Sequence, residues 1–153
     1  MTWTDLTFGK YKGLTLPQVL FRDVSWFFWL ATRPLFGVVA YEVHALLPKA
    51  KRIVVPQGTG DRLGVEYLVD QGSGVLAGVQ FVPAGMTREM GGSPSLILPH
   101  IDLGVPFRLA RRDKTGGKII IDFLKNAYFG STRHKMTRER CAEFFDDPSH
   151  FLP

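Results

Sequence analysis

Apolar residues in the first third of the chain recur at helical spacing, and turn-forming residues separate the runs. Pro17 suits the first turn of a short helix, because a helix does not use the backbone N–H there. Asp23 can cap a second helix over residues 24–32. A third helix is predicted over residues 37–49, where an apolar stripe repeats at helical spacing. The stripe consists of Val39, Val43, Leu46 and Leu47.

After Arg52 the pattern changes to short β-branched runs. These lie at residues 53–55, 65–69 and 75–82, and the segments QGTGDRLG and DQGSG between them are rich in hairpin-turn residues. Residues 95–105 return to extended structure after a loop. The middle of the chain therefore predicts a small antiparallel sheet.

The last third of the chain returns to helices. Residues 118–128 fit both a helical stripe and a strand, and we favour a helix because the stripe persists and Gly130 supplies a stop. Thr137 can cap a final helix with Cys141 and Phe144 on one face.

These elements predict an α+β fold, in which an N-terminal hairpin and three helices pack with a small antiparallel sheet and two C-terminal helices. Of the 153 residues, 45% are hydrophobic and 12% aromatic, which is enough to bury a core. We place a boundary at residue 52 and expect residues 1–52 and 53–153 to pack as one compact unit.

Cysteine use and apolar runs bear on the compartment. Cys141 is the only cysteine, so the chain can form neither an internal disulfide nor a cysteine-based zinc site, which fits a reducing compartment. The start MTWTDLTFG lacks the pattern of a signal peptide. The richest apolar stretch, residues 26–47, is interrupted by charged residues and proline, so we expect core helices, no membrane association and a cytoplasmic location.

Positive charge is concentrated in one segment. The net charge is +5, yet residues 108–140 hold ten lysines and arginines against three acids, so the rest of the chain is slightly acidic. Such a concentration is typical of a phosphate-binding surface. A solvated basic face without a partner is an equally weighted alternative.

The hexapeptide FGKYKG stands out near the N-terminus. Gly9 and Gly13 permit positive φ on both sides of a Lys-Tyr-Lys triplet, so the segment predicts a small hairpin or tight loop whose free N–H groups could seat a phosphate. In an extended triplet Lys10 and Lys12 would point to one side, toward phosphates, and Tyr11 to the other, where it could stack on a base. The alternative is a solvated turn with Tyr11 filling the core.

The hexapeptide also carries a resemblance. Together with the short apolar link at residues 16–19 and the aromatic run WFFWL at residues 26–30, it resembles the C-terminal module of exodeoxyribonuclease X-like proteins, whose pattern is F-G-K-[YH]-K-G followed by a W-L helix. The resemblance covers about residues 5–50, so residues 1–52 would form this module, and the rest of the chain resembles no family.

The resemblance implies nucleic-acid binding, because in that family the module accompanies nucleases and other DNA-processing domains. Carried over by position, the binding candidates are Gly9, Lys10, Tyr11, Lys12 and Gly13, while Trp26, Trp29 and Leu30 match as core residues. The family's acidic, metal-binding nuclease domain has no counterpart here, so nuclease activity is not implied.

Two further basic segments are candidate phosphate contacts. The segment RRDKTGGK reads as a basic turn between elements, and a solvated turn is an equally weighted alternative. A second arc follows in the link STRHK and the last helix. The candidates in these segments are Arg111, Arg112, Lys114, Lys118, Arg133, Lys135, Arg138 and Arg140.

No cofactor or metal site is predicted. His100 and Asp102 could share a strand face, but a metal site needs about three convergent ligands and no third is evident. A metal-dependent phosphodiesterase would need Glu66 and Asp70 to meet Asp102 or Asp122. We assign no catalytic residue, and enzymatic activity stays an open question.

The sequence therefore predicts a non-sequence-specific nucleic-acid-binding accessory protein of phage or bacterial DNA metabolism, with DNA as the expected ligand. A protein–protein interaction module is one alternative, because the helix at residues 24–32 carries four aromatic rings that cannot all be buried on one face. That helix could bind a partner or a second copy of the chain. A small metal-dependent phosphodiesterase is the less favoured alternative.

Overall fold

The computed structural model describes residues 1–56, 63–86, 95–111 and 113–153. In these ranges six helices, a short 3₁₀ turn and a three-stranded antiparallel sheet form an α+β fold, which confirms the predicted class. The helices are α1 (Leu16–Arg22), α2 (Val24–Ala31), α3 (Gly37–Lys51), α5 (Val105–Leu109), α6 (Lys114–Phe129) and α7 (Arg138–Asp146), and the 3₁₀ turn is η1 (Pro148–His150). The strands are β1 (Leu63–Val69), β2 (Leu76–Pro83) and β3 (Ser95–Leu98).

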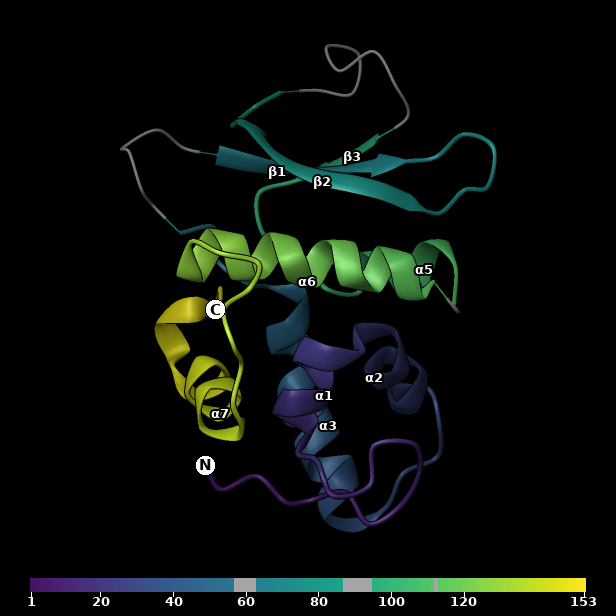
Figure 1. Cartoon of the computed structure of the whole chain (residues 1–153), viewed down its shortest axis with the longest axis vertical. Helices are drawn as coiled ribbons and strands as arrows, with labels where there is room; N and C mark the ends of the chain where they lie inside the picture. Colours follow the sequence, from purple (N-terminus) through teal and green to yellow (C-terminus); the bar gives the residue numbers. More distant parts are fainter. Residues whose placement is uncertain (57–62, 87–94, 112) are drawn as a thin grey trace.

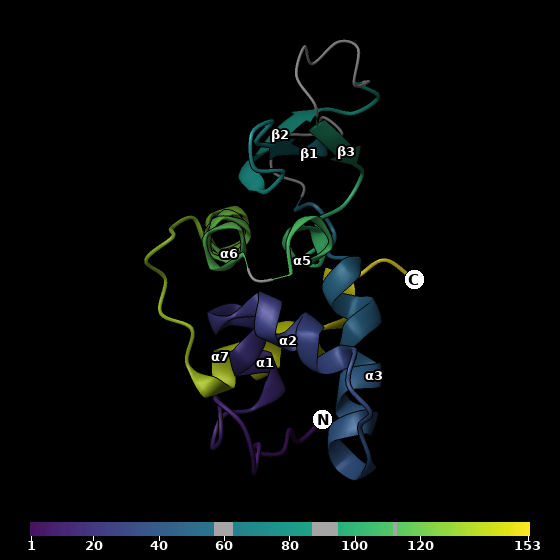
Figure 2. The same ribbon diagram turned by 90° about the vertical axis from the view of Figure 1, so that its right-hand side faces the viewer.

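The elements form three layers (Figures 1 and 2). The sheet forms one outer layer, α5 and α6 lie side by side in the middle, and α1, α2, α3 and α7 form the other outer layer. Phe81 of β2 packs on Phe123 of α6, with ring centroids 4.7 Å apart. Helix α6 is thus the element that joins the sheet to the remaining helices.

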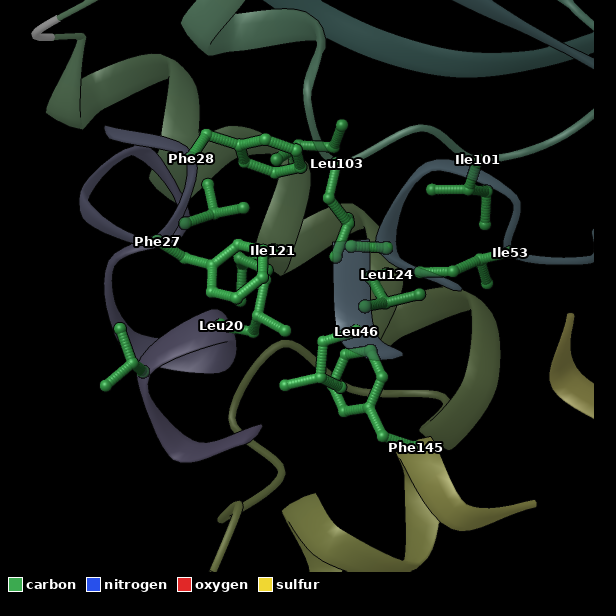
Figure 3. Close-up of a cluster of buried hydrophobic side chains, with 14 of the residues drawn as sticks. Leu20, Phe27, Phe28, Leu46, Ile53, Ile101, Leu103, Ile121, Leu124 and Phe145 are labelled. Atoms are coloured by element: carbon green, nitrogen blue, oxygen red, sulfur yellow. The ribbon is translucent and has the colours of Figure 1, made fainter. Parts of the chain in front are cut away.

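The core between α6 and the lower helices is built from long aliphatic and aromatic side chains (Figure 3). Leu20, Phe27, Leu46, Leu124 and Phe145 are fully or almost fully buried in one hydrophobic cluster. This cluster contains residues from before and after position 52, so side chains from both parts of the sequence share one core. Across the described ranges, no helix is long and apolar enough to cross a bilayer.

The caps predicted at Asp23 and Thr137 are present, and Thr15 caps α1. The Thr15 side chain accepts the Gln18 N–H as part of a capping box at α1, and the Asp23 carboxylate accepts the Trp26 N–H at α2. Thr137 caps α7 in the same way. These side chains satisfy backbone groups that the first turn of a helix leaves without partners.

The prediction of a basic turn over RRDKTGGK is wrong for residues 114–118, which form the start of α6. Helix α6 begins at Lys114, four residues before the predicted start, because the Asp113 carboxylate caps it by accepting the Gly116 N–H at 2.8 Å. The second glycine, Gly117, lies where α6 packs closely on α2. A Cβ at this position would lie only 3.2 Å from Val24 Cγ1, so the close packing favours glycine. The helix ends at Gly130 with φ of 75°, as predicted.

The sheet has the order β2-β1-β3, and β1 and β2 form the predicted hairpin. The extended segment predicted over residues 95–105 is shorter: β3 ends at Leu98 and α5 begins at Val105. The reason is that Pro106 occupies the first turn of α5, where no N–H is needed, and the Asp102 carboxylate accepts the Gly104 N–H at 2.8 Å. The run at residues 53–55 contributes only isolated bridges of Ile53.

Candidate nucleic-acid interface

The hexapeptide forms a tight loop without strands. Leu6 and Leu14 close its base, where the Leu6 N–H donates to the Leu14 carbonyl at 2.8 Å. Gly9 and Gly13 have φ of 78° and 91°, which explains both glycines. Gly9 also lies against the Trp26 ring, 3.1 Å from the position that a Cβ would take. The loop predicted from the sequence is therefore present, but as a tight loop instead of a hairpin with strands.

The N–H groups on the C-terminal side of this loop bond within the loop or to its base, whereas those of Gly9, Lys10 and Tyr11 have no hydrogen bond within the described residues. The Lys12 N–H donates to the Gly9 carbonyl, the Gly13 N–H to Leu6 and the Leu14 N–H to Tyr11. Three N–H groups are therefore used to close the loop, and those of Gly9, Lys10 and Tyr11 stay candidates for a phosphate contact.

The triplet is folded as a turn, and this changes the predicted directions of its side chains. The Tyr11 hydroxyl donates to the Asp23 carboxylate at 2.6 Å, and the Tyr11 ring packs edge-on against Trp26 with centroids 5.2 Å apart. Burial and the bond to Asp23 raise the pKa of Tyr11. Lys10 points toward the same acid, with its Nζ 3.6 Å from Asp23 Oδ2. Tyr11 is thus a half-buried anchor of the loop and not a free ring for stacking.

Helix α6 brings a second lysine to this place. Three surface clefts contain Lys10, and they are described below. Lys114, at the first position of α6, lines two of them, although the two residues lie far apart in the chain. The pKa of Lys10 is raised, mainly by a hydrogen bond with the Lys114 side chain and then by the charge of Tyr11. The loop and the start of α6, which the sequence suggested as separate contacts, therefore lie together.

Three adjoining clefts surround Lys10. The first, the aromatic cleft, has a volume of about 440 Å³, and the second, the basic groove between α1 and α6, also measures about 440 Å³. The third, the apolar groove, measures about 660 Å³. The aromatic cleft is lined by Lys10, Asp23, Ser25, Trp26, Trp29, Arg111 and Lys114. The polar lining of the basic groove comprises Lys10, Tyr11, Arg22, Asp23, Lys114, Lys118, Asp122 and Lys125.

Cations outnumber acids in the basic groove. Its two acids already have partners: Asp23 binds Tyr11 and Lys10, and Asp122 pairs with Lys118 at 2.8 Å. Among the described residues, no ion pair engages Arg22, Lys114 or Lys125. The groove therefore carries positive charge that no ion pair among the described residues neutralises, and phosphates of a polyanion could do so.

Other predicted contacts lie elsewhere. Arg133, Lys135, Arg138 and Arg140 belong to α7 and the connection before it, and no described cleft around Lys10 includes them. Arg138 pairs with Asp5 at 2.6 Å, and the Arg140 guanidinium donates to the Lys135 carbonyl at 2.8 Å. The second arc is therefore separate from the clefts and partly engaged in structural contacts.

Two more candidates complete the set. Lys12 is exposed at the tip of the loop and lines none of the three clefts that the structure describes around Lys10. Arg112 lies outside the described residues.

The acids considered for catalysis are dispersed. The Glu66 carboxylate is buried and accepts hydrogen bonds from Gln80 and Ser95. Asp70 accepts the Ser73 hydroxyl and N–H, which lower its pKa. Asp102 pairs with Arg108 at 2.9 Å. No group of three metal-binding side chains occurs in the described part of the chain, so the residues suggested for a phosphodiesterase do not meet there.

Several residues of the clefts were not among the predicted site residues, and three of them bear on ligand binding. Trp29, which the resemblance implied as a core residue, is 44% exposed and lines the aromatic cleft. Lys125 and Arg22 line the basic groove. Lys125 could have been found from helical spacing, because Lys114, Lys118, Asp122 and Lys125 follow one another three or four residues apart on one helix face. Arg22 gave no such signal.

Comparison of the chain with protein families, with curated proteins and with solved structures found no match. The resemblance to the exodeoxyribonuclease X-like module stays a prediction based on its hexapeptide and aromatic helix.

Proposed function

We propose that this protein is a non-sequence-specific nucleic-acid-binding accessory protein of phage or bacterial DNA metabolism, and that the clefts around Lys10 hold its ligand. One observation carries the proposal: the FGKYKG loop and α6 place Lys10 and Lys114 together at the junction of two clefts. The resemblance of residues 5–50 to a module that accompanies DNA-processing domains favours the same ligand.

The charge arrangement favours a ligand with repeated negative charges. Lys10 and Lys114 line the same two clefts, so a phosphate bound there would be attracted by both side chains. Lys118 and Lys125 extend the positive charge along α6. A row of cations along a groove matches the phosphates of a nucleic-acid backbone and releases counterions on binding.

Phosphate contacts alone give little sequence preference. The cations of the basic groove are mainly lysines, which act as point charges and bind phosphate without reading base edges. We therefore expect similar affinity for different sequences and a steep loss of affinity with salt.

Fluorescence anisotropy with labelled DNA and RNA, titrated across salt concentrations, tests the proposal. The double variant Lys10→Ala, Lys114→Ala should weaken binding and lower the salt slope by about two, because each lysine is expected to contact one phosphate. The matched control is Lys51→Ala, Arg52→Ala, which removes the same charge at the end of α3, outside the three clefts. It should change neither quantity.

The outcomes separate the candidate surfaces. Equal losses in both double variants would mean that net charge, and not the cleft, drives binding. A larger loss in an Arg133→Ala, Lys135→Ala variant would move the site to the second arc. Absence of binding at low salt would overturn the proposal.

A protein partner is the second candidate, and one observation favours it. Phe36, Val38 and Tyr41, at the start of α3, are 85%, 56% and 69% exposed. An exposed apolar group of this kind is typical of a surface that contacts another protein. This surface becomes the leading candidate if no nucleic acid binds.

A further inference from the structure

The aromatic cleft contains an exposed indole. Trp29 is 44% exposed and lies next to Trp26, with ring centroids 5.9 Å apart. Both rings line the aromatic cleft and the neighbouring apolar groove. The core of the protein does not need this exposed ring surface, since Phe27 and Phe28 of the same helix fill the interior.

Cations outnumber the one acid, Asp23, in the described lining of the aromatic cleft. Lys10, Arg111 and Lys114 line the aromatic cleft beside it, and the Arg33 guanidinium lies 5.7 Å from the centroid of the Trp29 ring. An apolar partner would gain nothing from these charges, and burying them would cost free energy. A ligand that offers both a flat ring and phosphates matches the whole cleft.

We propose that the aromatic cleft binds a base of a single-stranded nucleic acid, stacked on Trp29, while Lys10 and Lys114 hold the adjacent phosphates. The inference rests on the proposed function and adds strandedness to it. In a duplex the bases are stacked on one another and cannot reach the indole, whereas unpaired bases stack on aromatic side chains with little sequence preference.

The position of Tyr11 agrees with this assignment. Tyr11 also lies beside Trp26, but its hydroxyl is bound to Asp23 and its ring packs edge-on against Trp26. Of the two rings beside Trp26, Trp29 is thus the one available for stacking, and the experiment should change Trp29.

The experiment compares three ligands of about 15 nucleotides, namely oligothymidylate, an abasic strand of equal charge and a duplex. Oligothymidylate should bind more tightly than the abasic strand, because only its bases can stack. Trp29→Ala should weaken oligothymidylate binding by roughly 5- to 100-fold and leave the abasic strand unchanged. Trp29→Phe should retain part of the difference in affinity between oligothymidylate and the abasic strand. The control Tyr41→Ala changes an exposed aromatic residue outside the three clefts and should retain all of that difference.

Tryptophan fluorescence gives an independent readout. Trp3 is buried, so quenching by oligothymidylate should come from Trp26 and Trp29 in the cleft and should decrease strongly in Trp29→Ala. Equal affinity for oligothymidylate and the abasic strand, or undiminished binding in Trp29→Ala, would overturn the inference. The proposed function would survive that result if Lys10→Ala, Lys114→Ala still weakened binding. Failure of all three ligands to bind would instead remove the proposed function itself.

Discussion

At the scale of single residues, Asp23 holds much of the candidate interface in place. Its carboxylate caps α2, accepts the Tyr11 hydroxyl and pairs with Lys10. One acid thus fixes the start of the aromatic helix, the orientation of the loop and the direction of a predicted phosphate-binding lysine.

Gly116 is a second position where a single residue matters. A Cβ at this position would overlap the Asp113 carboxylate, which caps α6, and would come within 3.2 Å of Leu76 Cβ in the sheet. The residue is therefore a glycine for reasons of packing.

Gly116→Ala should lower the free energy of unfolding by about 1–2 kcal/mol, because the lost cap and the crowding outweigh the higher helix propensity of alanine. Urea denaturation measures this change. Thr115→Ala, at the exposed neighbouring position, is the control and should be neutral or slightly stabilising. Equal free energies of unfolding for the two variants would show that a Cβ at position 116 does not disturb the Asp113 cap.

At the scale of elements, α6 has three different surfaces. Its glycines face Asp113 and α2, its apolar side chains face the sheet and the helical core, and its lysines line the basic groove. The FGKYKG loop, by contrast, has one main anchor, which is Tyr11 on Asp23. Loss of that anchor should loosen the loop without removing a binding surface.

Tyr11→Phe should therefore lower the free energy of unfolding by about 1 kcal/mol, the usual net value of one hydrogen bond. The affinity for oligothymidylate should fall far less than in Trp29→Ala, because the Tyr11 ring is not assigned to stacking. Denaturation and anisotropy measure the two effects. Tyr41→Phe is the control, since its hydroxyl has no hydrogen bond within the described residues. If Tyr11→Phe bound oligothymidylate as weakly as Trp29→Ala at unchanged stability, Tyr11 would be part of the binding site.

At the scale of the whole molecule, α6 lies between the sheet and the helices (Figure 1). Ile120 of α6 is fully buried in the hydrophobic cluster that includes residues from both sides of position 52. If the chain unfolds as one unit, damage at this position should destabilise both parts together.

Ile120→Ala should lower the free energy of unfolding by about 2–5 kcal/mol, because it leaves a cavity in the core. Far-UV circular dichroism and tryptophan fluorescence should report the same single transition. Ile119→Ala, at the half-buried neighbouring position, should cost less. Two separate transitions would show that residues 1–52 and 53–153 fold as independent parts.

Local interactions explain what the sequence alone determined. The side chains of Thr15, Asp23 and Thr137 each cap a helix by accepting the N–H of the residue three positions later, and Gly130 ends α6 through its own φ. Hydrophobic periods and turn residues likewise depend on nearby residues in the chain, so α1, α2, α3, α6 and α7, the β1–β2 hairpin and the α+β class could be predicted. The short helix α5 was not predicted.

The start of α6 was harder to predict, because Gly116 and Gly117 indicate a turn unless their packing partners are known. The candidate site depended on tertiary structure for the same reason. Lys10 and Lys114 meet only because α6 packs across α2, and Trp29 stays exposed only because Phe27 and Phe28 fill the core. The sequence determined which charges and rings the protein has, and the packing of distant elements decided which of them share a cleft.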